Sequence, residues 1–462
     1  MRGFLASSIG VAAATALAVP LVFAVPALAE SAPETPAGST RSLPLVPLEP
    51  QAQAARGSAV PVPGTSRPEP ETRGLTAREV EKFSLVGVVW DDAGAELAGR
   101  VQVRTRDART ALWSDWQDVE IHNADHGADP DAAERGSGRV RGATAPLWVG
   151  ESDGVEVRVT AEPGTDRPAG RLPSGLRIEL VDPGAPTAVP GDGKNGTQPD
   201  GDDKGENAVP GLSMAAAEAS SANVPMAPMG ADEIKALNKA DSTADAAYAD
   251  DGNPAAATTP YIGPRPRIVT RKGWGADESL REPGFVYTQT VKAAFVHHSA
   301  SGNNYACKDA PAVLRSLYRY HVVSSGWRDF GYNFAVDKCG TVYEGRAGGV
   351  AKPVLGAHTM GFNTDSMGVV VLGSYGRTAP PAAALDSVAR LTAWKLGLFN
   401  RDPRAKTKLT SAGGNRYPKG RSVSMNVISG HRDGFATECP GKLLYAKLPP
   451  TRTASAKLQG RP

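Results

Sequence analysis

The chain has 462 residues and carries 51 lysines and arginines against 49 aspartates and glutamates, so its formal net charge is +2. A nearly balanced charge without a cluster of basic residues argues against nucleic acid as a partner. The length is sufficient for about three domains, but 51 glycines and 38 prolines indicate that part of the chain is linker.

Residues 1–29 have the features of a secretory signal peptide. Arg2 precedes a run of small apolar residues, and Ala-Leu-Ala at 27–29 provides an A-x-A cleavage site. The alternative is an uncleaved membrane anchor, which Pro20 and Pro26 disfavour. No later run is apolar enough to span a bilayer. We therefore expect a secreted protein without stable membrane insertion after cleavage.

Two segments have the composition of disordered spacers. Residues 30–74 are rich in proline, alanine, serine and glutamate and show no apolar periodicity. Residues 184–260 are rich in glycine, proline and aspartate, and only ADEIKALNKA within them favours a short helix. Neither segment can bury a core by itself, so both are predicted to be flexible.

Residues 75–183, between these spacers, contain five short apolar or alternating segments separated by glycine, aspartate or proline: FSLVGVVWDD, GRVQVRTRD, LWSDWQDVE, PLWVGESDGVEVRVT and SGLRIELVDPG. The pattern predicts a small, all-β, sandwich-like domain. Its four tryptophans are compatible with a carbohydrate platform, but packing in the core is the better interpretation. His122 and His126 lie in a polar, Asp-rich insertion and are predicted to be solvated.

Residues 261–450 interleave strand and helix patterns. VKAAFVHH and SMGVVVLG predict buried strands, GYNFAVDKCGTVYEGR predicts a hairpin, and NVISGH predicts a short strand. KDAPAVLRSLYRYHVVSSGW and PAAALDSVARLTAWKLGLF predict amphipathic helices. The expected fold is α/β, with a mixed central sheet flanked by helices. Residues 451–462 are predicted to be a flexible tail.

Histidines and a cysteine of this domain form a candidate metal site. His431 and Cys439 lie eight residues apart in VISGHRDGFATECPG, and imidazole and thiolate are ligands that zinc prefers. The doublet His297-His298 ends a predicted strand and offers a third ligand. Neighbouring strand residues face opposite sides, so one of the two binds, and the periodicity does not say which. Alternatively, His431 caps a turn and Cys439 belongs to a disulfide.

Three protein ligands would leave a fourth tetrahedral position for water, which is typical of catalytic zinc. Zinc acidifies water and polarises a carbonyl group, so amide hydrolysis is the expected reaction. The chain has three cysteines, and if Cys439 binds metal, Cys307 and Cys339 remain to pair in an oxidising compartment. His321 continues the apolar stripe of a helix, which favours a core histidine.

Five motifs of this domain carry a family resemblance. VHHSA, the YH…GWRDFGYNF segment, CGTVYEGR, GAHTMGFNTDSMGVVVLG and ISGHRDGFATECPG, in this order and spacing, resemble the peptidoglycan recognition protein family. That family is related to zinc N-acetylmuramoyl-L-alanine amidases of the phage T7 lysozyme type. The resemblance covers residues 268–448 and implies a mixed sheet flanked by helices, with a groove over the zinc ion.

The resemblance also implies roles for individual residues. It selects the first histidine of the doublet, His297, as the zinc ligand beside His431 and Cys439. It supports a disulfide between Cys307 and Cys339, because family members often tie the start of this helix to the core.

Two further residues match catalytic positions of the family. Tyr332 matches a tyrosine that assists the zinc-bound water and the developing oxyanion, and Thr437 matches a residue that supports the transition state. Family members that only recognise peptidoglycan commonly lack the cysteine ligand. This chain has Cys439, so the resemblance implies an active amidase.

A substrate groove is implied as well. His358 and Asn363, in GAHTMGFN, match residues that contact the muropeptide. Gly326, Trp327 and Arg346 resemble the combination that reads the carboxylate of a meso-diaminopimelate stem peptide, and a guanidinium can bind a carboxylate in a bidentate manner. The alternatives are that His358 orders a loop, that Trp327 packs the helix end and that Arg346 pairs with a nearby acid.

The sequence therefore predicts a secreted, cell-wall-associated, monomeric zinc amidase that cleaves the amide between N-acetylmuramic acid and L-alanine of peptidoglycan. The alternative function is a module that binds peptidoglycan without hydrolysing it. The role of residues 75–183 is open, and a wall-binding or adhesion module is one interpretation.

Overall fold

The computed structural model describes residues 38–48, 70–121, 123–162, 171–185, 212–248 and 261–462. The predicted signal peptide and its cleavage site lie outside these residues, and so does His122. None of the helices in the described ranges is long and apolar enough to cross a membrane.

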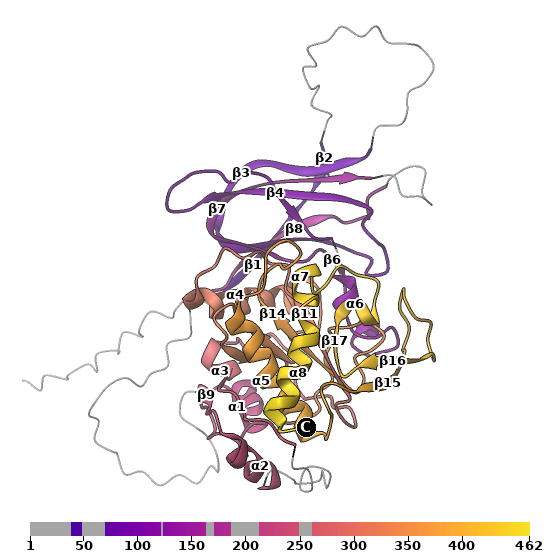
Figure 1. The fold of residues 1–462 in the computed structure, drawn as a ribbon. Coiled ribbons are helices and arrows are strands. Elements are labelled where there is room, and N and C mark those ends of the chain that lie inside the picture. Colours follow the sequence, from indigo (N-terminus) through magenta and orange to yellow (C-terminus); the bar gives the residue numbers. More distant parts are fainter. Residues whose placement is uncertain (1–37, 49–69, 122, 163–170, 186–211, 249–260) are drawn as a thin grey trace, which may run out of the picture. The chain divides into compact units, whose positions relative to one another are not determined.

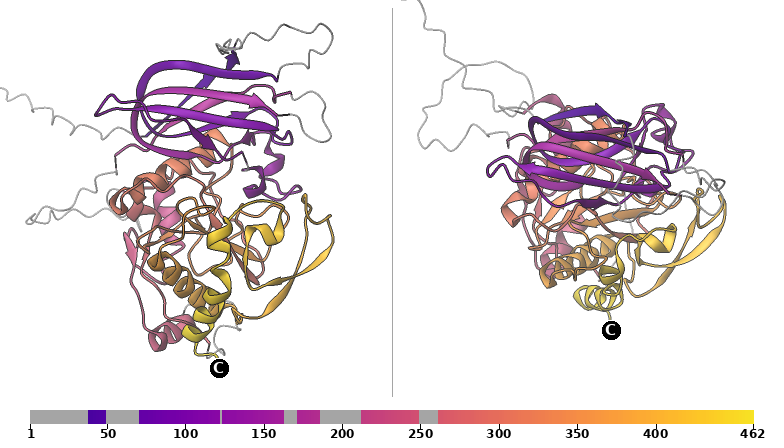
Figure 2. Two further views of the ribbon diagram at one scale, coloured as in Figure 1. Left: turned by 45° about the horizontal axis from the view of Figure 1, so that its top comes forward. Right: turned by 90° about the horizontal axis from the view of Figure 1, so that it is seen from above.

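The N-terminal part is an eight-stranded antiparallel sheet, which we call the β domain (Figures 1 and 2). Six strands follow the order β1-β8-β3-β7-β4-β5, and β2 and β6 also pair with β3. The strands are β1 (Ser39–Pro44), β2 (Val46–Pro47), β3 (Thr72–Trp90), β4 (Gly99–Asp107), β5 (Gln117–Val119), β6 (Gly142–Ala143), β7 (Leu147–Ala161) and β8 (Arg177–Asp182). Each of the five predicted segments contains a strand, so the β-rich prediction is confirmed.

The C-terminal domain is built on a seven-stranded mixed sheet in the order β17-β11-β14-β12-β13-β10-β9. Its strands are β9 (Glu233–Ile234), β10 (Ile268–Val269), β11 (Ala293–His298), β12 (Phe334–Val336), β13 (Val342–Glu344), β14 (Ser366–Val371) and β17 (Ile428–Gly430). Neighbours from β17 to β12 are parallel, whereas β12 and β13 are antiparallel. The predicted mixed sheet is confirmed.

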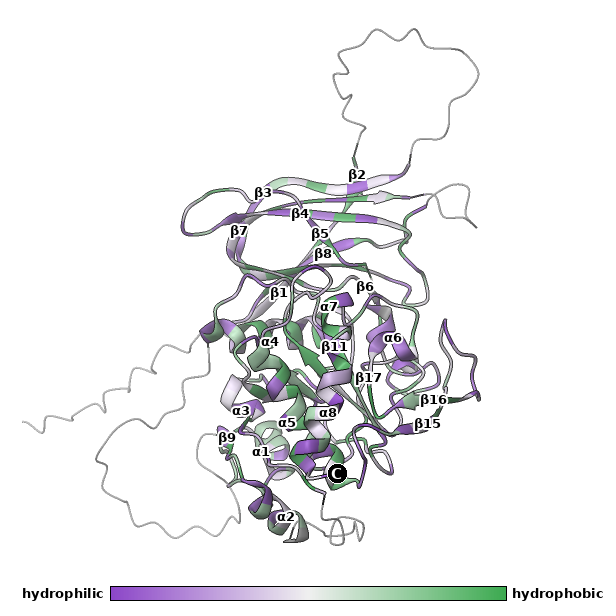
Figure 3. Cartoon of the chain, in the orientation of Figure 1, coloured by the Kyte–Doolittle hydropathy of each residue, from purple (hydrophilic) through white to green (hydrophobic). Residues whose placement is uncertain are grey.

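Helices cover both faces of this sheet. The helices are α1 (Met214–Ser221), α2 (Lys239–Tyr248), α3 (Arg271–Trp274), α4 (Ala310–Arg319), α5 (Ala382–Leu398), α6 (His431–Gly434), α7 (Lys442–Tyr445) and α8 (Leu448–Gln459). Alternate residues of β14 face opposite sides: Val369 packs in one cluster with Trp394 of α5, and Val370 packs in another with Leu314 of α4. Apolar residues accordingly gather along β11 and β14 in Figure 3. A separate hairpin, β15 (Lys406–Thr410) and β16 (Ser422–Asn426), was not predicted (Figure 2).

Three expectations of disorder are wrong in part. Within residues 30–74, β1 pairs along its length with β8, and Leu45 is buried. Within residues 184–260 lie α1, β9 and α2, and the predicted helix ADEIKALNKA contains β9 and only the first two residues of α2. The described parts of these segments lack an apolar period of their own and hydrogen-bond to partner elements, as β1 does to β8 and β9 to β10.

The predicted flexible tail, residues 451–462, is also wrong for most of its length, because it belongs to α8. The side chain of Gln459 donates to the carbonyl oxygen of Ala393 in α5 at 3.0 Å. Ser455 and Thr392, both buried, hydrogen-bond at 3.1 Å. The polar face of α8 thus packs against α5, which apolar periodicity does not reveal.

The predicted disulfide between Cys307 and Cys339 is confirmed. It joins a 3-10 turn at the start of α4 to the turn between β12 and β13. Cys439 is a free, buried cysteine.

Candidate metal site and groove

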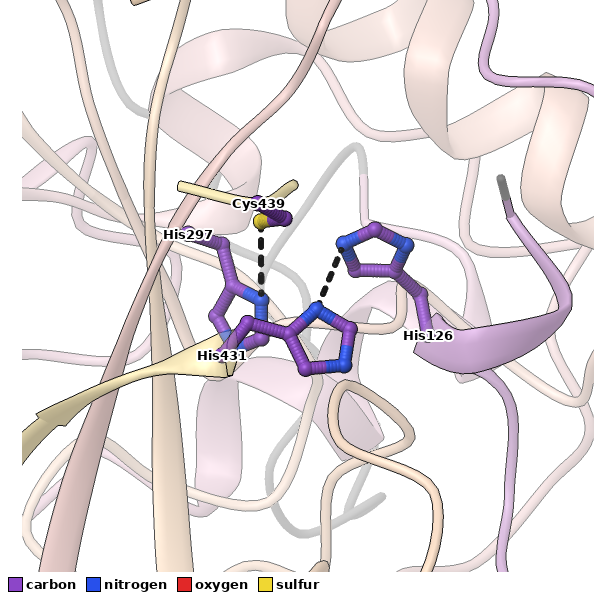
Figure 4. Close-up of side chains that lie close together, drawn as sticks. All are labelled: His126, His297, His431 and Cys439. Carbon is purple, nitrogen blue, oxygen red and sulfur yellow. Dashed lines mark hydrogen bonds between the residues drawn. The ribbon is translucent and has the colours of Figure 1, made fainter. Parts of the chain in front are cut away.

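Strand pairing brings two of the predicted ligands together. β11 and β17 are parallel neighbours in which Val296 pairs with Gly430, so the next residues, His297 and His431, leave the same edge of the sheet. Their ring centroids lie 4.7 Å apart. Cys439 follows on the loop after α6, and its Sγ lies 3.7 Å from Nδ1 of His297 (Figure 4).

His298 points elsewhere. Its Nδ1 accepts a hydrogen bond from the backbone N–H of Tyr375 at 3.3 Å, and its Nε2 lies 3.5 Å from the carboxylate of Glu120. The geometry therefore groups His297, and not His298, with His431 and Cys439.

A fourth residue, His126, joins this group and was missed. It lies in a 3-10 turn, Ala124–His126, in the insertion between β5 and β6, and its Nε2 is 3.2 Å from Nδ1 of His431 (Figure 4). One ligand atom from each of the four residues falls within 4.8 Å of all the others. The prediction that His126 is solvated is wrong, since its exposed fraction is 5%. The polar residues around His126 predict an exposed segment, whereas its burial arises from contacts with the C-terminal domain, which the local sequence does not show.

Each of the three imidazole rings has an oxygen atom within 3.4 Å of its outer nitrogen. The Asp125 carboxylate lies 3.1 Å from Nδ1 of His126, and the Asp125 carbonyl oxygen lies 3.1 Å from Nε2 of His431. The Thr359 hydroxyl lies 3.4 Å from Nε2 of His297. Acceptors at these positions favour protons on the outer nitrogens, so we assign lone pairs to the inner ones. Metal-binding histidines are held in this manner.

The donor set fits a tetrahedral zinc ion. With Zn–N of about 2.0–2.1 Å and Zn–S of about 2.3 Å, two ligand nitrogens are about 3.3 Å apart and a nitrogen and a sulfur about 3.6 Å apart. The inner nitrogens of His126 and His431 are 3.2 Å apart, and the Cys439 sulfur is 3.7 Å from His297.

Burial tunes the protonation of the ligands. Burial, assisted by neighbouring histidines, lowers the pKa of His297 well below its ordinary value and that of His431 to about 3, so both rings are neutral. Burial raises the pKa of the Cys439 thiol. A bound cation would offset this effect and favour the thiolate.

The two predicted catalytic residues lie beside the group. The buried ring of Tyr332 has its centroid 5.2 Å from that of His297, and burial raises the pKa of its phenol. The Thr437 hydroxyl accepts a hydrogen bond from the backbone N–H of Cys439 at 3.2 Å. Tyr332 thus carries a neutral phenol, and Thr437 stabilises the turn that carries the cysteine.

Two of the predicted groove residues form a buried loop support. Oδ1 of Asn363 accepts from the backbone N–H groups of His358 and Thr359 at 2.8 and 3.0 Å. Nδ1 of His358 lies 3.0 Å from the Thr359 hydroxyl, which in turn lies 3.4 Å from His297. This contact corresponds to the loop-ordering alternative for His358.

Arg346, which is predicted to bind a stem-peptide carboxylate, already binds a carboxylate of this chain. Arg346 makes a bidentate ion pair with Glu134 of the β domain, with Nη1–Oε2 at 2.9 Å and Nη2–Oε1 at 3.0 Å. Trp327 is buried and stacks on His321, with ring centroids 4.4 Å apart. Gly326 has φ +75°, and a Cβ there would lie 2.0 Å from the backbone oxygen of Arg139. In the folded chain, Trp327 is therefore a packing residue and Arg346 pairs with an acid, which are the alternative interpretations of these two residues.

Comparisons with known proteins assign the two domains separately. Residues 36–188 match the family described as Rv3811 N-terminal galactose-binding domain-like, and residues 287–442 match the N-acetylmuramoyl-L-alanine amidase family. Among solved structures, wild-type PGRP-LB of Drosophila matches with 28% identity and a TM-score of 0.32, over 39% of this chain and 92% of that one.

Curated relatives match the C-terminal domain. N-acetylmuramoyl-L-alanine amidase of Homo sapiens is 31% identical over 203 residues, which cover 43% of this chain and 30% of the human protein. Peptidoglycan-recognition protein SC2 of Drosophila simulans is 31% identical over 183 residues, which cover 39% of this chain and 84% of the relative. Through its C-terminal domain, the chain belongs to the peptidoglycan-recognition protein family, with peptidoglycan binding or amide hydrolysis as its function.

Proposed function

We propose that this protein is a secreted, zinc-dependent N-acetylmuramoyl-L-alanine amidase that acts on the peptidoglycan of the cell wall. The observation that carries the proposal is the grouping of His297, His431 and Cys439 with a neutral phenol, Tyr332, 5.2 Å from the His297 ring. A group that only binds peptidoglycan needs neither a thiolate ligand nor a buried proton donor beside it.

The site residues have different roles in the proposed amide hydrolysis. Zinc, when bound by His297, His431 and Cys439, supplies a Lewis acid that polarises the amide carbonyl and acidifies water. Tyr332 donates its phenolic proton in a hydrogen bond to the oxygen that becomes negative as the amide carbon turns tetrahedral. Thr437 keeps Cys439 in place through the backbone N–H of that residue.

Arg346 is the residue proposed to bind the free carboxylate of a diaminopimelate stem peptide. Its guanidinium is held by a hydrogen bond from Nε to the carbonyl oxygen of Phe330 at 2.7 Å, which leaves both terminal nitrogens for a bidentate partner. Glu134 takes that position in the folded chain.

A second candidate function is peptidoglycan binding without hydrolysis. It is favoured by one observation, the presence of His126 as a fourth potential ligand, because four protein ligands are typical of structural zinc sites. The two candidates differ in what happens when His126 is removed.

The test is digestion of purified sacculi that contain diaminopimelate stems by the full chain with one equivalent of Zn²⁺. The proteins are wild type, His126→Ala and, as the control, Cys439→Ser. We expect mass spectrometry to find free stem peptides that begin with L-alanine, together with glycan that carries unsubstituted lactoyl groups, in the His126→Ala digest. Cys439→Ser should release neither. A His126→Ala protein that binds zinc and releases no peptide would overturn the amidase proposal in favour of binding.

A further inference from the structure

Residues 123–135, which we call the inserted segment, lie between β5 and β6 of the β domain. Their composition is polar, yet Asn123, Asp125, His126 and Asp129 are at most 7% exposed. Buried polar groups require hydrogen-bonding or ionic partners. Side chains of the inserted segment make contacts at three places: the metal site, the loop that carries Asn363, and the Arg346 guanidinium that the proposed function assigns to the substrate.

The first contact is at the metal site. A catalytic zinc has three protein ligands and an open fourth position, whereas four protein ligands close the site. Nε2 of His126 lies 3.2 Å from Nδ1 of His431 and completes the group of four. The Asp125 carboxylate lies 3.1 Å from Nδ1 of His126, on the side of the ring that faces away from His431.

The second contact is at the loop that carries Asn363. Oδ1 of Asp129 accepts from the backbone N–H of Gly361 at 2.7 Å and from Nδ2 of Asn363 at 2.8 Å. The same Nδ2 also donates to the carbonyl oxygen of Gly127 at 3.0 Å. Both protons of the Asn363 amide are therefore committed to the inserted segment.

The third contact is at Arg346. The Glu134 carboxylate binds it in a bidentate manner and also accepts from the backbone N–H of Arg328 at 3.1 Å. The Arg346 and Glu134 side chains are both buried, so this pair differs from an ordinary surface ion pair. It presents to Arg346 the same chemical group as the free carboxylate of a stem peptide.

We propose that the inserted segment is a built-in inhibitor that mimics the substrate, with His126 in the open metal position and the Glu134 carboxylate in the pocket for the stem-peptide carboxylate. The proposal rests on the proposed function for its choice of substrate. The segment and a carboxylate-bearing muropeptide bind in a mutually exclusive manner, and the folded chain is latent until the segment leaves. Because the segment is part of the chain, it competes at a high effective concentration.

The first test uses a small anion as a probe of the open metal position. Cobalt(II) replaces zinc in the full chain, and sodium azide is titrated while the visible absorption is recorded. We expect no saturable change in wild type and a saturable change in His126→Ala, since only the variant has an exchangeable position. Equal responses in the two proteins would overturn the role of His126.

The second test measures binding of a muramyl tripeptide that ends in meso-diaminopimelate to metal-free protein by calorimetry. The double variant His126→Ala/Glu134→Gln should bind at least about tenfold more tightly than wild type, which corresponds to a pocket that is open in a tenth of the molecules or fewer. Asp131→Asn is the matched control, because Asp131 lies in the same segment but forms an exposed ion pair with Lys419. Equal binding by wild type and the double variant would contradict the proposal.

A third measurement needs no variant. Hydrogen–deuterium exchange of wild type with saturating tripeptide should become faster across residues 123–135, because the ligand displaces them. Unchanged or slower exchange there would overturn the inhibitor. Full hydrolysis by wild type, unaltered in His126→Ala, would also overturn latency while it supports the amidase. Positive azide and tripeptide results without hydrolysis in any protein would instead support the inhibitor and overturn the amidase.

Discussion

Tyr332 contributes to the site without being one of its potential metal ligands. Its ring lies beside those of His126 and His297, with centroid distances of 5.8 and 5.2 Å. Burial raises its pKa, so it keeps its proton at neutral pH and can donate a hydrogen bond. In the proposed reaction this donor acts when negative charge develops on the amide oxygen.

We therefore predict that Tyr332→Phe, in the His126→Ala background, lowers kcat for peptide release about 100-fold, as the loss of one oxyanion donor does. Zinc affinity, measured by competition with a chelating dye, should stay within error of the parent, because the phenol is not a ligand. A parallel loss of zinc affinity would instead assign Tyr332 a structural role at the metal site.

The residues of the site differ in how well sequence reasoning could find them. His431 and Cys439 share one short motif, and His297 ends an apolar strand, so residue type and position both pointed to them. Strand periodicity did not separate His297 from His298; the family motif did. His126 carried no such pattern, because its environment consists of polar residues that are buried by contacts between distant segments.

Secondary-structure elements also differ in whether a local sequence pattern predicts them. Strands such as β4, β11 and β14 bury apolar residues of their own and could be predicted from periodicity. In contrast, β1, α1 and α8 are ordered by hydrogen bonds to partner elements. For α1, the chain just after the helix docks through Asn223, whose amide donates to the buried Glu344 carboxylate of β13 at 2.8 Å. Composition alone does not reveal such a partner.

Burial of the Glu344 carboxyl predicts a pH dependence of stability. Burial raises the pKa of Glu344 to about 7, although Asn223 and Arg271 act in the opposite direction. Between the unfolded pKa near 4.5 and the folded value, the native state binds more protons than the unfolded state, so stability falls as pH rises. We expect the free energy of unfolding to decrease by roughly 2–3 kcal/mol from pH 5 to 7.5, a conversion of the pKa shift.

Urea unfolding of wild type and Glu344→Gln at several pH values checks this expectation. The glutamine variant cannot ionise at this position, so the difference in unfolding free energy between the two proteins should change across the interval in favour of the variant. Parallel pH profiles would show that the Glu344 carboxyl keeps an ordinary pKa in the folded state.

At the scale of the whole molecule, one cluster of buried side chains contains residues of both domains. Leu85 and Trp148 of the β domain share it with Leu314 and Tyr320, from α4 and the turn that follows it. The Tyr320 hydroxyl also donates to the carbonyl oxygen of Thr144 at 3.0 Å. An apolar contact with buried hydrogen bonds favours cooperative unfolding of the β domain and the C-terminal domain rather than the behaviour of two independent domains.

A substitution at Gly87 of β3 can weaken this contact between the domains while every residue of the metal site and of the inserted segment stays the same. A Cβ at Gly87 would lie 2.3 Å from the Tyr320 hydroxyl, which must then move. We predict that Gly87→Val splits a single calorimetric unfolding transition into two and, because the inserted segment belongs to the β domain, raises tripeptide affinity toward that of His126→Ala/Glu134→Gln. Gly136→Val is the matched control, since nothing lies within 4 Å of its Cβ position. Two separate transitions in wild type would contradict cooperative unfolding of the two domains. If Gly87→Val shows two transitions and its tripeptide affinity is unchanged, the inserted segment docks without help from the β domain.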